Sequence, residues 1–247
     1  MPHFVPREER EYNLKWARDM RENKWIPEIW NWKKNHRDEL TAGDGEEVGR
    51  ICQRDHPLIL DICSGPAGGF VPAVLLLGDY DARVMLSDLS PTVVREWRNF
   101  LRALDNPPPH AEYAAFDVHE VPFADESIDV VTGYSAIINI EGGEHAKGLS
   151  EVHRVLKKGG LFVMSDQAVT EECRESLPAW QREQLMGRYP NIFTDFQEEL
   201  QNLGYESVET AVKGTWSNKN DQSTLADLVR GWGTELIFSQ YTKYCVK

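Results

Sequence analysis

The sequence predicts an α/β fold: a seven-stranded, mainly parallel sheet with helices on both faces and an antiparallel strand at one edge, preceded by a small helical unit. From Leu58 onward, short apolar runs alternate with amphipathic helical segments, as is typical of a mainly parallel sheet covered on both faces. The chain has 247 residues, enough for one large domain with an appendage. We therefore expect a helical cap or lid over residues 1–50 and the main domain over residues 51–247.

The first fifth of the chain stands out because it contains four of the eight tryptophans. Apolar residues at helical spacing predict a helix from Arg7 to Lys24. A second short helix is expected to begin near Pro27, since proline suits the first helical turn, and a third to pass through Val48 and Cys52. These helices either dock on the sheet or form a lid whose tryptophans present apolar surface to a substrate.

Seven short apolar runs are the predicted strands of the main domain. They are Leu58–Ile62, Ala82–Ser87, Glu112–Phe116, Ile128–Gly133, Gly160–Ser165, Glu206–Val212 and Phe238–Cys245. No long helical pattern separates the last two runs. We therefore expect them to pair with each other in antiparallel fashion at one edge of the sheet.

The helices between these strands have their own start and stop signals. Ser90 is a predicted N-cap, and the helix that follows it must end before Pro107. Gly143–Lys158 carries apolar residues on one face, with Gly159 placed as a C-terminal cap. The segment Thr194–Gln197 fits a capping box at the start of another helix.

Composition excludes several functional classes. The chain has 27 Lys and Arg against 40 Asp and Glu, a net charge of −13, and nucleic-acid binding is not expected because phosphate contacts need a basic surface. No apolar stretch approaches the roughly 20 residues that span a bilayer, and the N-terminus lacks the apolar core of a signal peptide, so we expect a cytoplasmic protein without membrane contact. The four cysteines lie far apart without a CxxC pair, which predicts neither a metal site nor a disulfide framework.

The exit of the first strand is the first place to look for a ligand, because ligands of open α/β sheets bind at the carboxyl ends of strands. There the chain reads Asp61-Ile-Cys63-Ser-Gly65, followed by further small residues. A dinucleotide fingerprint fails in register, since Ala67 and Phe70 stand where its second and third glycines belong, and no P-loop lysine follows. What remains is a loop that can approach a ligand closely.

Acidic residues also follow the second and third strands. Asp88 lies 27 residues after Asp61, and a carboxylate at that strand end can accept hydrogen bonds from both hydroxyls of a ribose. After the third strand, Asp117 can accept a hydrogen bond from an adenine amino group, while the backbone N–H of Val118 can donate to a ring nitrogen. Three acids at three successive strand ends predict a nucleoside site.

The segment from about Leu58 to Lys247 resembles the class I S-adenosylmethionine-dependent methyltransferases, a Rossmann-like superfamily, and within it the small-molecule branch. The glycine loop, the acids at positions 88 and 117, and the stretches VPFADESIDVV and LSEVHRVLKKGGLFVMSD carry the resemblance in the expected order. It implies S-adenosylmethionine as cofactor, S-adenosylhomocysteine as its product, and no metal. The cofactor-binding residues that it implies are Asp61, Cys63, Gly65, Asp88, Leu89, Asp117, Val118, Tyr134 and Ser135.

The chain departs from the family pattern at four positions, one of which is Lys158, where the family frequently has proline. Cys63 and Ala67 replace two glycines of the loop, and small residues there can preserve its shape. Asn139 stands where many relatives have histidine, which puts histidine-based catalysis at that position in doubt. Tyr134 and Ser135 either line the methionine side of the cofactor or pack in the core.

No catalytic residue is assigned from the sequence, and the candidates are His145, Asp166 and Tyr134. The resemblance implies methyl transfer to an O, N, S or C nucleophile of a small molecule, with residues 167–191 and 213–235 facing this substrate. The tryptophans in these segments and in the first fifth of the chain indicate an apolar or aromatic metabolite. Two alternatives stay open: an enzyme of the same fold with other chemistry, and a non-catalytic module that binds the cofactor or its product. The chain is expected to be a monomer or a homodimer.

Overall fold

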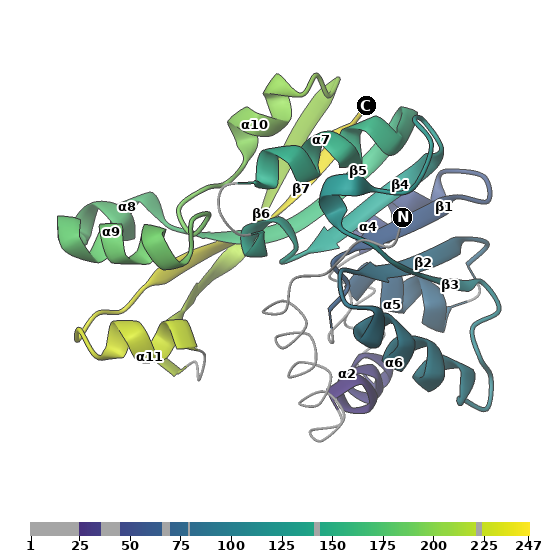
Figure 1. The fold of residues 1–247 in the computed structure, drawn as a ribbon, viewed down its shortest axis with the longest axis horizontal. Coiled ribbons are helices and arrows are strands. Elements are labelled where there is room, and N and C mark those ends of the chain that lie inside the picture. Colours follow the sequence, from purple (N-terminus) through teal and green to yellow (C-terminus); the bar gives the residue numbers. More distant parts are fainter. Residues whose placement is uncertain (1–24, 36–44, 66–69, 79, 141–143, 221–223) are drawn as a thin grey trace.

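The chain folds around a single seven-stranded sheet. The computed structural model describes residues 25–35, 45–65, 70–78, 80–140, 144–220 and 224–247. Within them the strand order is β3-β2-β1-β4-β5-β7-β6 (Figure 1). The strands from β3 to β5 are parallel, and β7 is antiparallel to both of its neighbours, β5 and the edge strand β6. The predicted seven-stranded, mainly parallel sheet is therefore confirmed.

The strands and helices of the described residues have the following bounds. The strands are β1 (Leu58–Ile62), β2 (Arg83–Asp88), β3 (Ala111–Ala115), β4 (Ile128–Tyr134), β5 (Leu156–Val169), β6 (Ser207–Ser217) and β7 (Ile237–Val246). The α-helices are α2 (Trp25–Asn35), α4 (Gly45–Cys52), α5 (Phe70–Leu77), α6 (Pro91–Arg102), α7 (His145–Val155), α8 (Glu171–Ser176), α9 (Ala179–Arg188), α10 (Gln197–Asn202) and α11 (Thr224–Arg230). Three 3-10 turns are η1 (Val118–Glu120), η2 (Ile137–Asn139) and η4 (Asn218–Asn220).

Strands β1 to β4 match their predicted ranges to within a residue at each end, and the predicted N-cap of α6 is confirmed. Ser90 has extended backbone angles, and its Oγ accepts a hydrogen bond from the N–H of Val93 at 3.4 Å. The expected helices at residues 27 and 48 are present as α2 and α4. The helix predicted from Arg7 to Lys24 lies outside the described residues.

The prediction for the end of α7 was wrong. The helix ends at Val155, and the chain enters β5 at Leu156, which pairs with Ile128 of β4. Leu156 is fully buried, so extended pairing covers it better than another helical turn would. Gly159 has a φ of 70° but does not cap the helix. It lies within β5, where its N–H donates to the carbonyl of Lys247.

The predicted capping box at Thr194–Gln197 was also wrong. Helix α10 begins only at Gln197, and the preceding Phe196 adopts a left-handed conformation with φ 60°. Phe196 is completely buried in the core, which accounts for this unusual backbone, and the Asp195 carboxylate accepts the N–H of Gln197 at 3.1 Å instead. The start of α10 is therefore set by the burial of Phe196 and not by a capping box.

Two hydrophobic clusters cover the two faces of the sheet. Helices α7 and α10 pack on one face, where Leu149 and Phe162 are buried. Helices α2, α4, α5 and α6 pack on the other (Figure 1). On that face Trp30 of α2 contacts Trp97 and Phe100 of α6 edge-on, with ring centroids 6.4 Å and 6.0 Å apart. The described part of the first fifty residues is thus docked on the main domain.

A third cluster forms a separate lobe, which we call the distal lobe. Strands β5, β6 and β7 continue beyond the other strands and carry α8, α9 and α11 at their far end (Figure 1). The lobe packs around its own buried side chains, which include Leu185, Val229 and Phe238. Both predicted substrate-facing segments, residues 167–191 and 213–235, contribute to this lobe.

Candidate functional site

The carboxylate of Asp61 joins the first strand to its neighbours. Asp61 is 1% exposed, and its two oxygens accept hydrogen bonds from Thr132 Oγ1 on β4 at 2.7 Å and from Ser64 Oγ at 2.6 Å. The main-chain carbonyl of Asp61 also accepts the hydroxyl of Ser87 on β2 at 2.7 Å. The residue therefore holds the start of the loop after β1 in a fixed position between two strands.

The loop that follows turns sharply. Cys63 has a φ of 50° and Gly65 a φ of 55°, both in the left-handed region that favours glycine. The carbonyl of Gly65 accepts a hydrogen bond from Trp97 Nε1 of α6 at 2.7 Å. Sequence reasoning did not detect this contact, because the two partners lie 32 residues apart in the chain.

Asp88 ends β2 next to this loop. Its Oδ2 accepts the N–H of Gly65 and its Oδ1 accepts the N–H of Ser90, each at 2.9 Å. Burial raises the pKa of this carboxyl group, while the two backbone hydrogen bonds oppose the rise. A carboxylate offers about four acceptor sites, so Asp88 retains capacity for two further donors. The neighbouring Leu89 is largely exposed.

The third predicted acid lies at the end of β3. Asp117 caps the η1 turn: its Oδ1 accepts the N–H of His119 at 2.9 Å and lies 2.6 Å from His119 Nδ1. About half of the Asp117 side chain is exposed, which leaves it open to a ligand, and Val118 is buried beside it. Asp61 and Asp88, in the last residues of β1 and β2, and Asp117, just after β3, thus lie at the same end of three parallel strands.

Tyr134 at the end of β4 connects this edge to helix α4. Its hydroxyl lies 3.1 Å from Glu47 Oε2, and Glu47 also accepts Thr242 Oγ1 at 3.1 Å and lies 3.2 Å from Lys213 Nζ. Glu47 is 1% exposed, and sequence reasoning missed it. The available signal was its position four residues before Ile51, on the apolar face of a short helix.

Ser135 begins the turn after β4. It has a φ of 48°, and its N–H donates to the carbonyl of Ser165 on β5 at 2.8 Å. Asn139, at the end of η2, donates from Nδ2 to the carbonyl of Ser135 at 2.5 Å. The asparagine that departs from the family pattern therefore links the end of η2 to the start of the turn.

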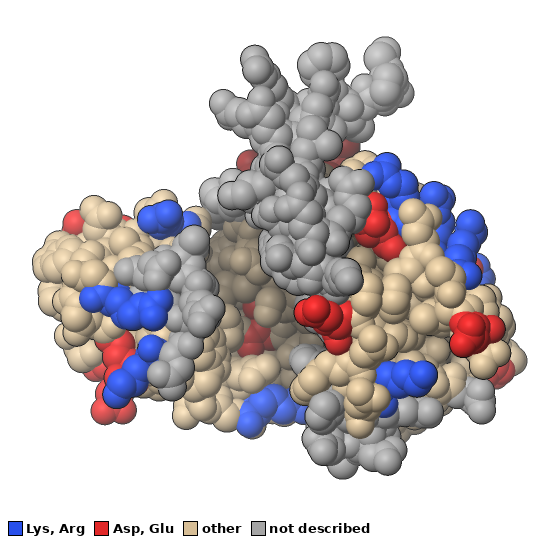
Figure 2. Space-filling view, turned by 90° about the horizontal axis from the view of Figure 1, so that it is seen from below, with Lys and Arg blue, Asp and Glu red and all other residues tan. Residues whose placement is uncertain are grey.

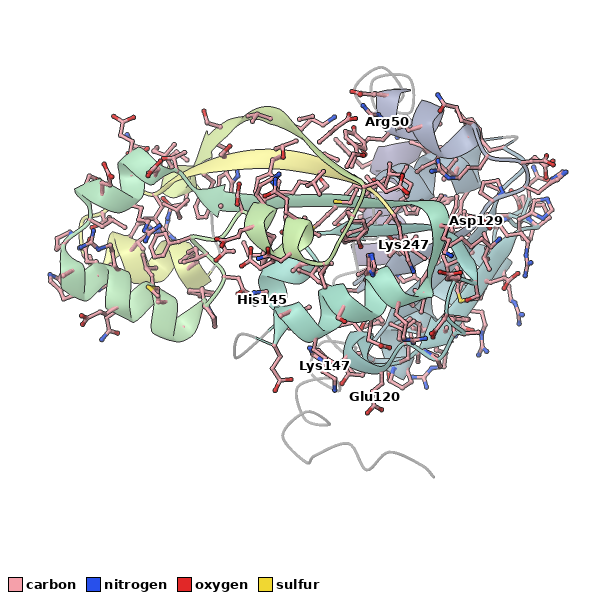
Figure 3. All side chains as sticks on the ribbon, turned by 90° about the horizontal axis from the view of Figure 1, so that it is seen from above. Arg50, Glu120, Asp129, His145, Lys147 and Lys247 are labelled. Carbon is pink, nitrogen blue, oxygen red and sulfur yellow. The ribbon has the colours of Figure 1, made fainter. Side chains whose placement is uncertain are left out.

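The two other catalytic candidates lie in different surroundings. His145 begins α7 and turns toward α10, where Nε2 lies 3.8 Å from Glu199 and the ring meets Phe196 edge-on (Figure 3). Asp166 lies on β5 and accepts the N–H of Ile138 at 3.2 Å. Burial raises the pKa of Asp166 to about 7.

Four carboxylates act together on Cys63. Burial, and after it the negative charges of Asp88, Asp61, Asp117 and Asp166 in that order of effect, together raise the pKa of this thiol to about 12. The thiol is therefore protonated at neutral pH and is not a nucleophile. Figure 2 shows a hollow between the distal lobe and the main body, with acidic side chains in and beside it and basic side chains below it. The four carboxylates that act on Cys63 favour a positively charged ligand.

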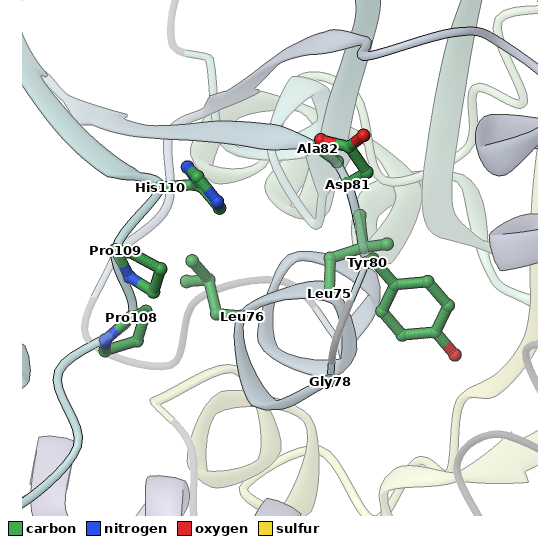
Figure 4. A pocket seen from close by; sticks show the side chains of 9 residues that line it. All are labelled: Leu75, Leu76, Gly78, Tyr80, Asp81, Ala82, Pro108, Pro109 and His110. Carbon is green, nitrogen blue, oxygen red and sulfur yellow. The ribbon is translucent and has the colours of Figure 1, made fainter.

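A pocket of about 340 Å³ lies at the opposite end of the sheet (Figure 4). Its walls include Tyr80, Ala82 and His110. Ala82 directly precedes β2 and His110 directly precedes β3, whereas Asp88 ends β2 at the other edge. This pocket is therefore separate from the acidic site.

The described residues contain no cluster of three or more His, Cys, Asp or Glu side chains that could hold a metal ion. Within the same residues, no helix has the length and apolar character needed to cross a membrane. The four cysteines, all in the described part of the chain, are free thiols.

Comparisons with known proteins agree with the fold and with the class of domain. A family model described as a methyltransferase domain matches residues 60–164, from β1 to β5. The resemblance to class I S-adenosylmethionine-dependent methyltransferases is thereby confirmed for this domain and for its fold.

Two curated relatives match parts of the chain. A sarcosine/dimethylglycine N-methyltransferase of Aphanothece halophytica is 34% identical over 92 residues, which are 36% of this chain and 32% of that protein. A dimethylglycine N-methyltransferase of Parasynechococcus marenigrum is 49% identical over 47 residues, 19% of this chain and 16% of that protein. The matches thus span a third or less of these relatives.

Among solved structures, the phosphoethanolamine N-methyltransferase 2 of Haemonchus contortus has the same fold. Its complex with S-adenosylmethionine aligns with a TM-score of 0.57 at 18% identity, covering 82% of this chain and 52% of that chain. A second complex of the same enzyme contains phosphomonomethylethanolamine and S-adenosylhomocysteine.

Proposed function

We propose that this protein transfers a methyl group from S-adenosylmethionine to the nitrogen of a small amine. The observation that carries the proposal is the set of acids at three successive strand ends, Asp61, Asp88 and Asp117, within a methyltransferase domain. The two curated relatives and the Haemonchus enzyme are all named as N-methyltransferases of small molecules, which supports nitrogen as the acceptor atom.

The residues at the site fit this cofactor. The spare acceptor capacity of Asp88 suits a ribose diol, and the half-exposed carboxylate of Asp117 suits an adenine amino group beside the N–H of Val118. Gly65 and Cys63 turn the loop toward the methionine end, which Tyr134 and Ser135 would border on the β4 side, with Leu89 beside the ribose. When bound, S-adenosylmethionine supplies a methyl group on a positively charged sulfur, and the surrounding carboxylates suit that charge.

The distal lobe is the proposed site of acceptor recognition. Trp216 of β6 stacks on Phe238 with ring centroids 4.6 Å apart, and its Nε1 donates to Gln167 Oε1 at 3.0 Å. Trp180 meets Trp232 edge-on at 5.2 Å. Rigid aromatic side chains offer flat apolar surface at low entropic cost, and aromatic faces also attract ammonium groups.

The full chain is expected to methylate an amine in a direct assay. Purified protein would be incubated with methyl-labelled S-adenosylmethionine and sarcosine, dimethylglycine or phosphoethanolamine, and label would be followed into the acceptor by mass spectrometry. Transfer to a nitrogen supports the proposal. Transfer only to oxygen, sulfur or carbon acceptors in a wider panel contradicts the choice of nitrogen.

Two further outcomes of the same assay separate the alternative functions. Consumption of the cofactor without movement of a methyl group would indicate an enzyme of the same fold with other chemistry. Tight binding in calorimetry without turnover of any acceptor would indicate a binding module. Either result contradicts the proposed reaction.

The N-terminal segment is proposed to act as a lid over the site. Removing residues 1–24, while keeping the docked helix α2, is expected to lower turnover by about an order of magnitude or more, since a covered site excludes water and holds the reactants in line. Thermal unfolding should remain cooperative, because Trp30 keeps its contacts with α6. Full turnover in the shortened protein would mean that the segment serves another purpose.

Size-exclusion chromatography with light scattering decides between the monomer and the homodimer.

A further inference from the structure

One carboxylate oxygen of the buried Asp166 has no hydrogen-bond partner among the described residues. The side chain is 2% exposed, its Oδ2 accepts the N–H of Ile138 at 3.2 Å, and its Oδ1 is buried without a hydrogen-bond partner among the described residues. An unpaired buried carboxylate oxygen is costly, and an apolar residue would avoid the cost. We therefore expect a ligand to contact this unpartnered oxygen.

The carboxylate is held in one orientation from two sides. Its partner Ile138 belongs to the η2 turn, whose carbonyls at Ile137 and Ile140 accept hydrogen bonds from Asn191 Nδ2 at 3.3 Å and 2.9 Å. The preceding residue of β5, Ser165, accepts the N–H of Ser135. A turn fixed in this way presents the N–H of Ile138 to one oxygen of Asp166, and the backbone N–H groups of Gln167 and Ile137 also favour the charged carboxylate.

The titratable groups that face Asp166 are uncharged at neutral pH. They are the thiol of Cys63, after β1, and the hydroxyl of Tyr241, which lies opposite Asp166 on β7. Burial and the charge of Asp166 raise the pKa of both groups. The η2 residues packed against Asp166 do not titrate, and the carboxylates of Asp61, Asp88 and Asp117 act, like Asp166, on Cys63. No cationic side chain of the described residues contributes to the Asp166 pKa, which burial raises to about 7.

We propose that Asp166 accepts one proton from the ammonium form of the acceptor and so frees the nitrogen lone pair for methylation. This assignment rests on the proposed function and identifies the acceptor as an amine that is protonated in solution. One N–H bond breaks and one O–H bond forms at Oδ1, and a cation and an anion become a neutral pair. A buried site favours that neutralisation. The carboxylic acid then returns its proton to solvent after the product leaves.

The first test is the pH dependence of turnover in Asp166→Asn, which keeps the shape of the side chain and its acceptor for Ile138. With dimethylglycine, sarcosine or phosphoethanolamine as acceptor, kcat should fall by about 10²- to 10⁴-fold at pH 7 while KM changes little. Wild-type turnover should rise with pH to a midpoint at or below about 7, since bound cations lower the pKa of the acid. The variant should lose that rise and recover activity only where the free amine itself predominates. A kcat within about threefold of wild type, with the pH profile unchanged, overturns the proposal.

A second measurement does not need methyl transfer. In protein carrying ¹³C-labelled aspartate and bound S-adenosylhomocysteine, the infrared band of the protonated Asp166 carboxyl is identified by its absence in Asp166→Asn. Adding dimethylglycine, sarcosine or phosphoethanolamine should lower its titration midpoint, because an ammonium beside the carboxylate favours the charged form. An unmoved midpoint with every amine overturns the assignment. A lowered midpoint without methylation would contradict the proposed reaction and support the role of Asp166.

Thermal unfolding shows whether the variant folds. The folded-state pKa of Asp166, about 7, lies above its unfolded value of 3.8, so the charged form destabilises the fold progressively as pH rises from about 4 to about 7. Asp166→Asn should therefore have a higher melting temperature than wild type at pH 8, and this advantage should vanish near pH 4. Asp105→Asn, an exposed acid after α6, is the matched control and should leave both melting temperature and turnover unchanged.

Discussion

Replacing Asp88 with alanine should weaken S-adenosylmethionine binding by about 10- to 100-fold. The substitution removes the acceptor assigned to the ribose hydroxyls, and a hydrogen bond to a charged group contributes about 1.5–3 kcal/mol. It also releases the N–H groups of Gly65 and Ser90, which Asp88 now holds at 2.9 Å each. The loop after β1 would lose its anchor to β2 at the same time. Isothermal titration calorimetry of the purified full chain measures the change directly.

Asp88→Asn separates the two contributions. Its remaining carbonyl oxygen can keep one backbone N–H, so the loop should be less disturbed and the loss of affinity should be smaller than in Asp88→Ala. Because burial raises the pKa of Asp88, wild-type affinity should decline on acidification at a higher pH than an ordinary aspartate would cause. Asp105→Ala is the control. Unchanged binding in Asp88→Ala would contradict the ribose assignment.

Asp61→Ala is expected to lower the free energy of unfolding by about 3 kcal/mol, equivalent to roughly 6–12 °C in melting temperature for a chain of this size. Two buried hydroxyls, Ser64 Oγ and Thr132 Oγ1, would lose the charged acceptor that they share. Apolar neighbours cannot replace that acceptor, and the cavity left by the carboxylate adds to the cost. Urea unfolding followed by circular dichroism gives the difference.

Asp61→Asn should cost less, since one carbonyl oxygen can still accept from one of the two hydroxyls. An exposed substitution such as Asp105→Ala should change the free energy of unfolding by no more than about 0.5 kcal/mol. If Asp61→Ala unfolds at the same urea concentration as wild type, Asp61 does not hold β1, β4 and the loop together. Its place in the protein would then have to be explained by the ligand alone.

The predicted parts of the fold were those coded by nearby residues. Strands β1 and β4 were legible because their runs are almost continuously buried. The full length of β5 was not: residues 157 and 158 were assigned to the preceding helix and Gly159 to its cap, whereas β5 begins at Leu156, which pairs with Ile128 of β4. The end of α7 was missed for the same reason, and the cap of α10 because a single buried aromatic, Phe196, determines the local backbone.

The residues of the candidate site likewise divide into those that the sequence predicted and those that it did not. Asp88 and Asp117 were predicted because residues at the carboxyl ends of parallel strands must lie at one edge of the sheet. Glu47 and Trp97 were not predicted in their roles, since each meets a partner far away in the chain: Tyr134 lies 87 residues from Glu47, and Gly65 lies 32 from Trp97. Sequence spacing carries no information about such pairings.

The separate packing of the distal lobe has a consequence for how this protein can change. The lobe has its own buried cluster, and its connection to the main body includes the ladders of β5, β6 and β7. On the proposal that acceptors are recognised there, substitutions around Leu185 and Phe238 can alter the choice of amine while the acids proposed to hold the cofactor stay in register. Substitutions in the distal lobe can then change the acceptor without altering the residues at the carboxyl ends of β1, β2 and β3.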